Sequence, residues 1–151
     1  MLEAPPLLPG TRAPDATLTA SDGSDVTLSA AWQKGGVLLI FYPGNNTPGC
    51  DRQLRELKDE FARFAALGIT AFGVNPASAG EHREYAAGLG LPFLLLSDPG
   101  LKASAAWQAV APLGDQITRT VYRVDADGII RFGARGMPGA DITLEGLEEG
   151  R

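Results

Sequence analysis

The stretch that decides the fold is FYPGNNTPGC, residues 41–50. It completes a short apolar run, residues 36–42, that is typical of a buried strand. Proline, glycine and two asparagines then favour a turn over residues 43–46. Thr47 is a good helix N-cap, and Pro48 suits the first helical position because proline has no N–H to leave unpaired there. The stretch therefore predicts a buried strand, a tight turn and the start of a helix.

Cys50, the only cysteine in the 151 residues, falls in the first turn of this helix. Free backbone N–H groups and the positive end of the helix dipole surround a side chain at that place. Both favour the thiolate, which is the reactive form of cysteine. The hydroxyl of Thr47 lies at capping distance, so it can accept from the Cys50 N–H and donate to the sulfur. The position favours a reactive role; the alternative is an inert buried cysteine.

Apolar residues at intervals of three and four predict that the helix runs from Pro48 to about Leu67. The charged positions between them are expected in solvent, and one face turns towards the sheet. That face carries Cys50, Leu54, Leu57, Phe61 and Phe64. The thiol is therefore expected at the mouth of the helix, shielded but reachable.

Strands and helices alternate along the rest of the chain, after an extended lead-in over residues 1–13. A hairpin is expected from residues 15–20 and 25–28, and Ser29 is expected to cap a short helix through Gln33. Further strands are predicted at 69–74, 93–96, 118–124 and 129–132, and helices at 78–88, 101–107 and from Thr143. This order predicts an α/β fold with a central mixed sheet covered on both faces. Ligand sites in such sheets lie at the carboxyl ends of strands, where residues 43–50 fall.

Length and composition favour one domain over residues 1–151. The net charge of -5 and the lack of a basic cluster argue against nucleic acid as a partner. No apolar run is long enough to span a membrane, and the N-terminus lacks a secretory pattern. One cysteine cannot form an intrachain disulfide, which fits the cytoplasm. With one cysteine and one histidine, neither a metal nor another cofactor is expected.

Residues 43–50, with the pattern P-x-x-x-T-x-x-C, resemble the active-site signature of peroxiredoxins, which are thiol peroxidases with a thioredoxin-like fold. The longer string is similar to the branch called bacterioferritin comigratory protein, or PrxQ. Other segments are similar to that branch in the same order: APD at 13–15, SDG at 21–23, LPFLLLSDP at 91–99 and RTVYRVDADG at 119–128. The resemblance covers nearly the whole chain and implies a peroxiredoxin-type fold with an N-terminal β-hairpin.

The resemblance also implies a catalytic set formed by Cys50, Thr47, Arg119 and Pro43. An arginine at the place of Arg119 hydrogen-bonds the thiolate and the peroxide in that family, and a fixed guanidinium suits this task. Without the resemblance, Arg119 reads as a surface residue at a strand start. Arg123 lies four residues further along the same strand and is a weaker rival. Pro43 is expected to shape the loop and shield the sulfur.

Two departures from the family pattern stand out. Arg55 occupies the position where many members carry a second, resolving cysteine, and the tail after Gly133 is short and glycine-rich. The resemblance therefore implies a single-cysteine peroxidase for hydroperoxides, reduced by an external thiol or a thioredoxin- or glutaredoxin-type protein. It is expected to be a monomer or weak homodimer without nucleic-acid or membrane partners. The alternatives are a non-enzymatic redox sensor and a thioredoxin-like binding module.

The remaining polar and aromatic residues are expected to serve the fold. His82 reads as a solvated helix residue, and Trp32 and Trp107 as packing residues. Asp98 is a candidate cap for the helix that follows it. Asp125 belongs to a hairpin turn rather than a metal site.

Overall fold

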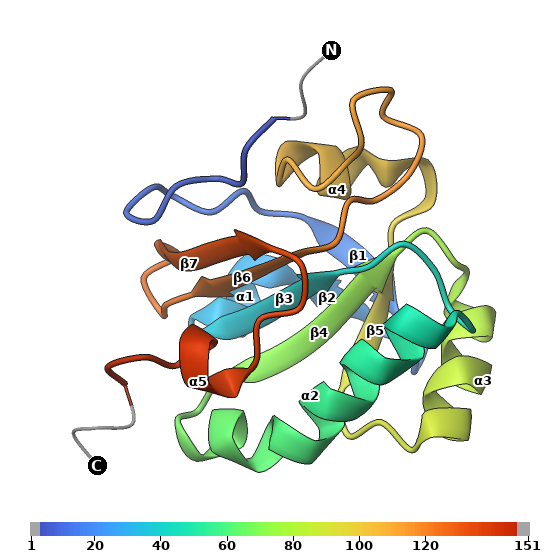
Figure 1. Cartoon of the computed structure of the whole chain (residues 1–151), viewed down its shortest axis with the longest axis horizontal. Helices are drawn as coiled ribbons and strands as arrows, with labels where there is room; N and C mark the ends of the chain where they lie inside the picture. Colours follow the sequence, from blue (N-terminus) through green and yellow to red (C-terminus); the bar gives the residue numbers. More distant parts are fainter. Residues whose placement is uncertain (1–3, 148–151) are drawn as a thin grey trace.

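Seven strands form one mixed sheet in the computed structural model, which describes residues 4–147 (Figure 1). Their order across the sheet is β2-β1-β5-β4-β3-β6-β7. The strands are β1 (Thr17–Ala20), β2 (Asp25–Thr27), β3 (Val37–Phe41), β4 (Thr70–Asn75), β5 (Leu94–Ser97), β6 (Thr120–Val124) and β7 (Ile130–Arg135). The central strands β3, β4 and β5 are parallel, while β6 and β1 pair antiparallel at either side. The predicted mixed sheet with an N-terminal β-hairpin is confirmed.

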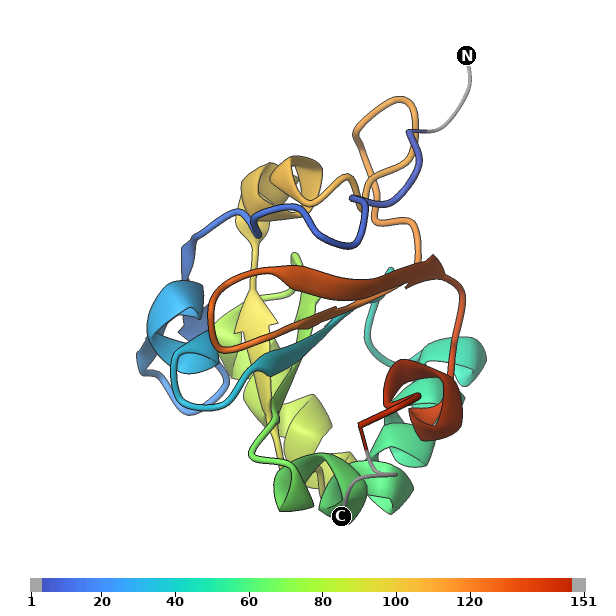
Figure 2. The same ribbon diagram turned by 90° about the vertical axis from the view of Figure 1, so that its left-hand side faces the viewer.

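Helices cover both faces of this sheet (Figure 2). One face is covered by α2 (Pro48–Ala66), α3 (Ala79–Leu89) and α5 (Ala140–Thr143), and the other by α1 (Leu28–Trp32) and α4 (Lys102–Ala106). A single 3₁₀ turn, Pro99–Leu101, leads into α4. Within residues 4–147, no helix combines the length and the hydrophobicity that crossing a bilayer requires.

The strand β3 lies at the centre of the core, and all five of its residues are buried. Alternate side chains point to opposite faces of a strand. One set, which includes Phe41, therefore packs in the same cluster as Trp32 and Trp107, and the other set packs beneath α2. The ring of Phe41 lies 5.9 Å from that of Trp107. Both tryptophans are core residues, as predicted.

The side chains of Tyr42, which directly follows β3, and Leu95 lie close to the backbone of β4 at Gly73. A β-carbon at Gly73 would lie 2.7 Å from Cδ2 of Leu95 and 3.0 Å from Cε1 of Tyr42. Only glycine leaves room for both groups at this point. The fully buried phenol of Tyr42 is thereby brought beneath the loop that starts α2.

The predicted capping of α1 by Ser29 is wrong. The helix begins at Leu28, and the residue before it makes no side-chain cap. Instead, Asp15 accepts from the Ser29 N–H at 2.9 Å and from its hydroxyl at 2.6 Å. A carboxylate from the segment just before β1 thus satisfies a free donor of the first turn, a long-range contact that the local sequence does not reveal.

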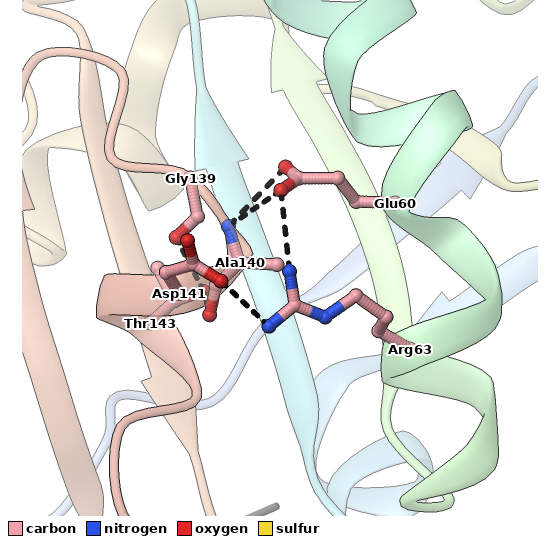
Figure 3. Close-up of polar contacts among 6 residues, drawn as sticks. All are labelled: Glu60, Arg63, Gly139, Ala140, Asp141 and Thr143. Atoms are coloured by element: carbon pink, nitrogen blue, oxygen red, sulfur yellow. Dashed lines mark hydrogen bonds and ion pairs between the residues drawn. The ribbon is translucent and has the colours of Figure 1, made fainter.

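The last helix ends at Thr143 instead of beginning there. The Glu60 carboxylate accepts from the Ala140 N–H at 3.1 and 3.2 Å, and Arg63 forms an ion pair with Asp141 at 2.8 Å (Figure 3). These two contacts from α2 fix the start of α5 at Ala140. Because α2 supplies them, the start of α5 depends on tertiary packing and not on a local signal.

The lead-in runs beside β7 as an extended segment. The Gly10 N–H donates to the carbonyl of Ile130 at 2.7 Å, and the Ile130 N–H donates to the carbonyl of Thr11 at 2.9 Å. The prediction of an extended lead-in is confirmed for residues 4–13 except at a turn over residues 8–11, which the Thr11 N–H closes by donating to the carbonyl of Leu8 at 3.2 Å. Its first part, residues 1–3, lies outside the described residues.

Candidate active site

The loop between β3 and α2 places Cys50 at the carboxyl ends of the parallel strands. Thr47 is the N-cap of α2, and its Oγ1 accepts from the Cys50 N–H at 3.3 Å, as predicted. Pro48 occupies the first turn. Cys50 is a free thiol with only 1% of its surface exposed, and it packs in the cluster of Leu54 and Leu57. The sulfur therefore lies beneath the first turn and not on the open surface.

Arg119 supplies a cation to this sulfur. Its Nη2 donates to Sγ of Cys50 at 3.4 Å, and its Nη1 donates to Oε1 of Gln53. The next residue, Thr120, pairs with Phe41, so the register of β6 on β3 brings Arg119 to the end of the sheet where the loop begins. The predicted proximity of Arg119 to Cys50 is confirmed.

Gly49 leaves space for the guanidinium. A β-carbon at this position would lie 3.4 Å from Nη2 of Arg119, at the short limit of ordinary van der Waals contact. The methyl group of alanine at position 49 would therefore lie directly against the guanidinium. The absence of a side chain at Gly49 thus leaves Nη2 of Arg119 free to approach the sulfur of Cys50.

Gln53 is a site residue that the sequence analysis missed. It is 5% exposed, one turn after Cys50 on the same helix. Residues three apart share a helix face, so a glutamine at this place on a buried face was an available signal. Its carboxamide oxygen holds Arg119 Nη1 and leaves Nη2 directed at the sulfur.

The rival arginine, Arg123, lies elsewhere. It pairs with Leu38, three positions along β3 from Phe41, which places it about 10 Å down the strand. Its Nε donates to the carbonyl of Thr143 at 2.8 Å, so its side chain holds the C-terminal segment. Burial lowers the pKa of this guanidinium. The structure therefore assigns Arg123 to packing rather than to the thiol.

Two phenols flank the first turn of α2. Tyr85 of α3 donates to Oδ1 of Asp51, and burial, then Asp51, then electrostatic repulsion from Cys50 raise the pKa of Tyr85. Burial first, and then Tyr85 and Cys50, raise the pKa of Tyr42. Both phenols therefore keep their protons at neutral pH and act as hydrogen-bond donors.

Pro43, between Tyr42 and Asn45, is exposed, and its shielding of the sulfur stays a prediction.

The expectation that His82 is solvated is wrong, because the side chain has no exposed surface. His82 lies three residues before the buried Tyr85, so both face the sheet when α3 docks. Its Nε2 lies 3.1 Å from the carbonyl of Leu96, and its Nδ1 lies 3.2 Å from Nδ2 of Asn45. Burial lowers the pKa of the imidazole, so it is neutral at neutral pH.

The other acidic candidates serve local structure. Asp98 accepts from the N–H groups of Ala103 and Ser104 in the first turn of α4, although Leu101 and not Asp98 occupies the N-cap position of that helix. Asp125 accepts from the N–H groups of the β6–β7 turn and pairs with Arg131. Across residues 4–147, no group of three or more His, Cys, Asp or Glu side chains is arranged to hold a metal ion.

Comparison with known proteins agrees with this geometry. The AhpC/TSA family model matches residues 9–132. A chloroplastic peroxiredoxin Q of Oryza sativa subsp. japonica is 35% identical over 124 residues, covering 82% of this chain and 57% of that protein. A putative peroxiredoxin of Mycobacterium tuberculosis is 33% identical over 130 residues and covers 82% of both chains. The chain belongs to the AhpC/TSA family, and the resemblance to the PrxQ branch is confirmed.

Solved structures confirm the peroxiredoxin type of thioredoxin-like fold. The peroxidoxin BcpB of Mycobacterium tuberculosis superposes with a TM-score of 0.85 at 25% identity, covering 95% of this chain and 97% of the other. A mutant PrxQ of Xylella fastidiosa gives the same TM-score and coverage at 24% identity. The present chain spans little more than half of the plant relatives, 57% of the rice protein.

Proposed function

We propose that this chain is a single-domain, thiol-dependent peroxidase in which Cys50 reduces hydrogen peroxide and organic hydroperoxides. The observation that carries the proposal is the 3.4 Å contact between Arg119 Nη2 and Cys50 Sγ. An arginine stays charged at any physiological pH, so its fork stabilises a thiolate and the negative charge that develops on a peroxide oxygen. An inert packing cysteine has no need of a half-buried guanidinium at its sulfur.

The reaction begins with the thiolate of Cys50 attacking the terminal oxygen of the hydroperoxide. A sulfur–oxygen bond forms as the oxygen–oxygen bond breaks, so the sulfur is oxidised to a sulfenic acid and the peroxide is reduced. The other oxygen leaves as hydroxide or alkoxide and takes up a proton to become water or an alcohol. Arg119 and the hydroxyl of Thr47 orient the peroxide, and Pro43 limits access to the sulfur.

An external thiol completes the cycle, because the chain has one cysteine and Arg55 stands where a resolving cysteine would lie. A thiol attacks the sulfenic acid, water leaves, and a mixed disulfide remains. A second thiol then attacks this disulfide and regenerates Cys50. The reductant is a low-molecular-weight thiol or a thioredoxin- or glutaredoxin-type protein, which fits a cytoplasmic location. We propose that the protein acts as a monomer or weak homodimer.

The substitution Cys50→Ser tests the proposal. Serine is nearly isosteric with cysteine but is a far poorer nucleophile, so peroxide consumption in the presence of a dithiol should fall to the background rate. Circular dichroism and thermal unfolding should show an intact fold. Peroxide turnover that persists above background in this variant would rule out Cys50 as the peroxidatic residue.

A further inference from the structure

The side chain of Asn45 joins the active-site loop to the core through three hydrogen bonds. Its Oδ1 accepts from the Tyr42 hydroxyl at 2.7 Å and from Nδ2 of Asn75 at 3.1 Å. Its Nδ2 lies 3.2 Å from Nδ1 of His82. Each of the three partners has no exposed surface. A loop side chain therefore reaches into a buried polar cluster.

One fixed backbone N–H sets which atom donates and which accepts in each hydrogen bond of this cluster. The Ala77 N–H donates to Oδ1 of Asn75 at 2.8 Å, which turns the Asn75 amide nitrogen towards Asn45. The oxygen of Asn45 must then face Asn75, and its nitrogen must face His82. His82 accepts at Nδ1 and donates from Nε2 to the carbonyl of Leu96 at 3.1 Å. The chain of bonds thus starts at a fixed N–H and ends at a fixed carbonyl.

The partners of Asn45 represent all three parallel strands. Tyr42 directly follows β3, Asn75 is the last residue of β4, and His82 binds the backbone of Leu96 in β5. The loop is consequently fixed to the carboxyl edge of the sheet at three places. Polar networks that reach into the core hold their members in place, and they are sensitive to the loss of any member.

The backbone of Asn46, the next residue, has an unfavourable conformation that the hydrogen bonds of Asn45 help to hold. Asn46 has a φ of 60°, in the left-handed region that only a few non-glycine residues adopt. Its backbone hydrogen-bonds with Tyr85, which also holds Asp51 in the first turn of α2. Thr47, the N-cap that holds the Cys50 N–H, follows at once. A shift of the loop therefore moves the cap and the sulfur relative to Arg119.

We propose that Asn45 is a positioning residue for Cys50, acting through its buried hydrogen bonds to Tyr42, Asn75 and His82. It does not contact the peroxide. Its amide fixes the loop between β3 and α2, and the loop fixes the cap and the first turn in which the thiolate meets Arg119. The inference deepens the proposed peroxidase function, and only its kinetic readout rests on that function.

The test compares Asn45→Ala with the wild type in two independent assays. The first is the rate of Cys50 alkylation by iodoacetamide against pH, which reports thiolate formation without any peroxidase activity. The second is the rate constant for oxidation by hydrogen peroxide. We expect half-maximal alkylation to move to higher pH and the peroxide rate constant to fall by about tenfold or more, since small displacements of reacting groups have effects of this order.

The matched control is Ser104→Ala. Ser104 is also fully buried, and its hydroxyl donates to Asp98 at 2.6 Å, but it lies in α4 on the opposite face of the sheet. This variant should lose thermal stability without a change in either thiol assay.

If Asn45→Ala does not fold, Asn45→Ser takes its place, because serine keeps a polar group but is too short to span the cluster.

A second pair of variants tests the path through His82. His82→Gln keeps one donor and one acceptor, whereas His82→Leu removes both, so the glutamine variant should oxidise faster than the leucine variant. Wild-type alkylation and oxidation in Asn45→Ala, with only a loss of stability like that of Ser104→Ala, would overturn the proposal. If alkylation of Asn45→Ala moves to higher pH as expected but the wild-type protein does not react with peroxide, the peroxidase function is rejected and the positioning role of Asn45 is retained.

Discussion

Replacing Arg119 with methionine removes the guanidinium from the Cys50 sulfur while roughly preserving the length of the side chain. The lost group is half-buried, lies 3.4 Å from Sγ, and is held in place by Gln53 before the peroxide arrives. A hydrogen bond to a charged group contributes about 1.5–3 kcal/mol, or roughly 10- to 150-fold in rate if all of it acts in the transition state. Part of the contact already exists with the thiolate, so we expect a loss of about 10- to 100-fold.

Stopped-flow measurement of thiol loss under excess hydrogen peroxide gives the rate constant directly. The matched control is Arg123→Met, an identical change four residues later in β6, where the guanidinium donates to the Thr143 carbonyl. The control should lose stability through the C-terminal segment and react with peroxide as the wild type does. Equal rates for Arg119→Met and the wild type would refute the assignment of Arg119 to transition-state stabilisation.

Three further predictions follow from the single thiol and from the buried histidine. Without a reductant, one equivalent of peroxide should give protein with one added oxygen, and excess peroxide should add a second, seen by mass spectrometry; a disulfide-linked dimer as the main product would mean that two chains resolve each other. The pKa of His82 is lowered from 6.5 by burial, so the unfolded chain binds the proton first as pH falls. The free energy of unfolding should therefore decrease below pH 6.5, down to the pKa of the folded state, and urea denaturation should show a weaker decrease in His82→Gln. Arg55→Cys should form a disulfide with Cys50 only slowly, because five residues along a helix leave a rotation of about 140° and the bond requires β-carbons about 3.5–4.5 Å apart. Peptide mapping that finds Cys50 over-oxidised beside a free introduced thiol would show that α2 does not unwind.

Local chemistry explains why the region around Cys50 is predictable from the sequence. The apolar run, the turn residues, the N-cap Thr47 and Pro48 all act over a few positions, and α2 begins where they indicate. The helical spacing likewise assigns Cys50 and Leu54 to the buried face. Arg119 is different, because only the family resemblance singled it out; its contact with the sulfur depends on the register of β6 against β3.

The errors concern residues whose environment comes from distant parts of the chain. His82 has charged neighbours in the sequence, yet docking of α3 buries it against β5. Gln53 was overlooked because the apolar spacing of α2 does not reveal a polar residue that binds an arginine distant in the sequence, just before β6. The limits of α5 depend on Glu60 of α2, which no pattern near Ala140 could indicate.

Activation of Cys50 towards peroxides by the fold is measured by the rate at which the purified reduced protein loses its thiol to hydrogen peroxide. Free cysteine under the same conditions is the reference. Preorganised charge stabilisation by Arg119 and the helix start predicts a second-order rate constant about a hundredfold or more above that of free cysteine. A rate constant equal to that of free cysteine would show that the fold does not activate Cys50, and a thiol that persists in excess peroxide would mark Cys50 as an inert core residue.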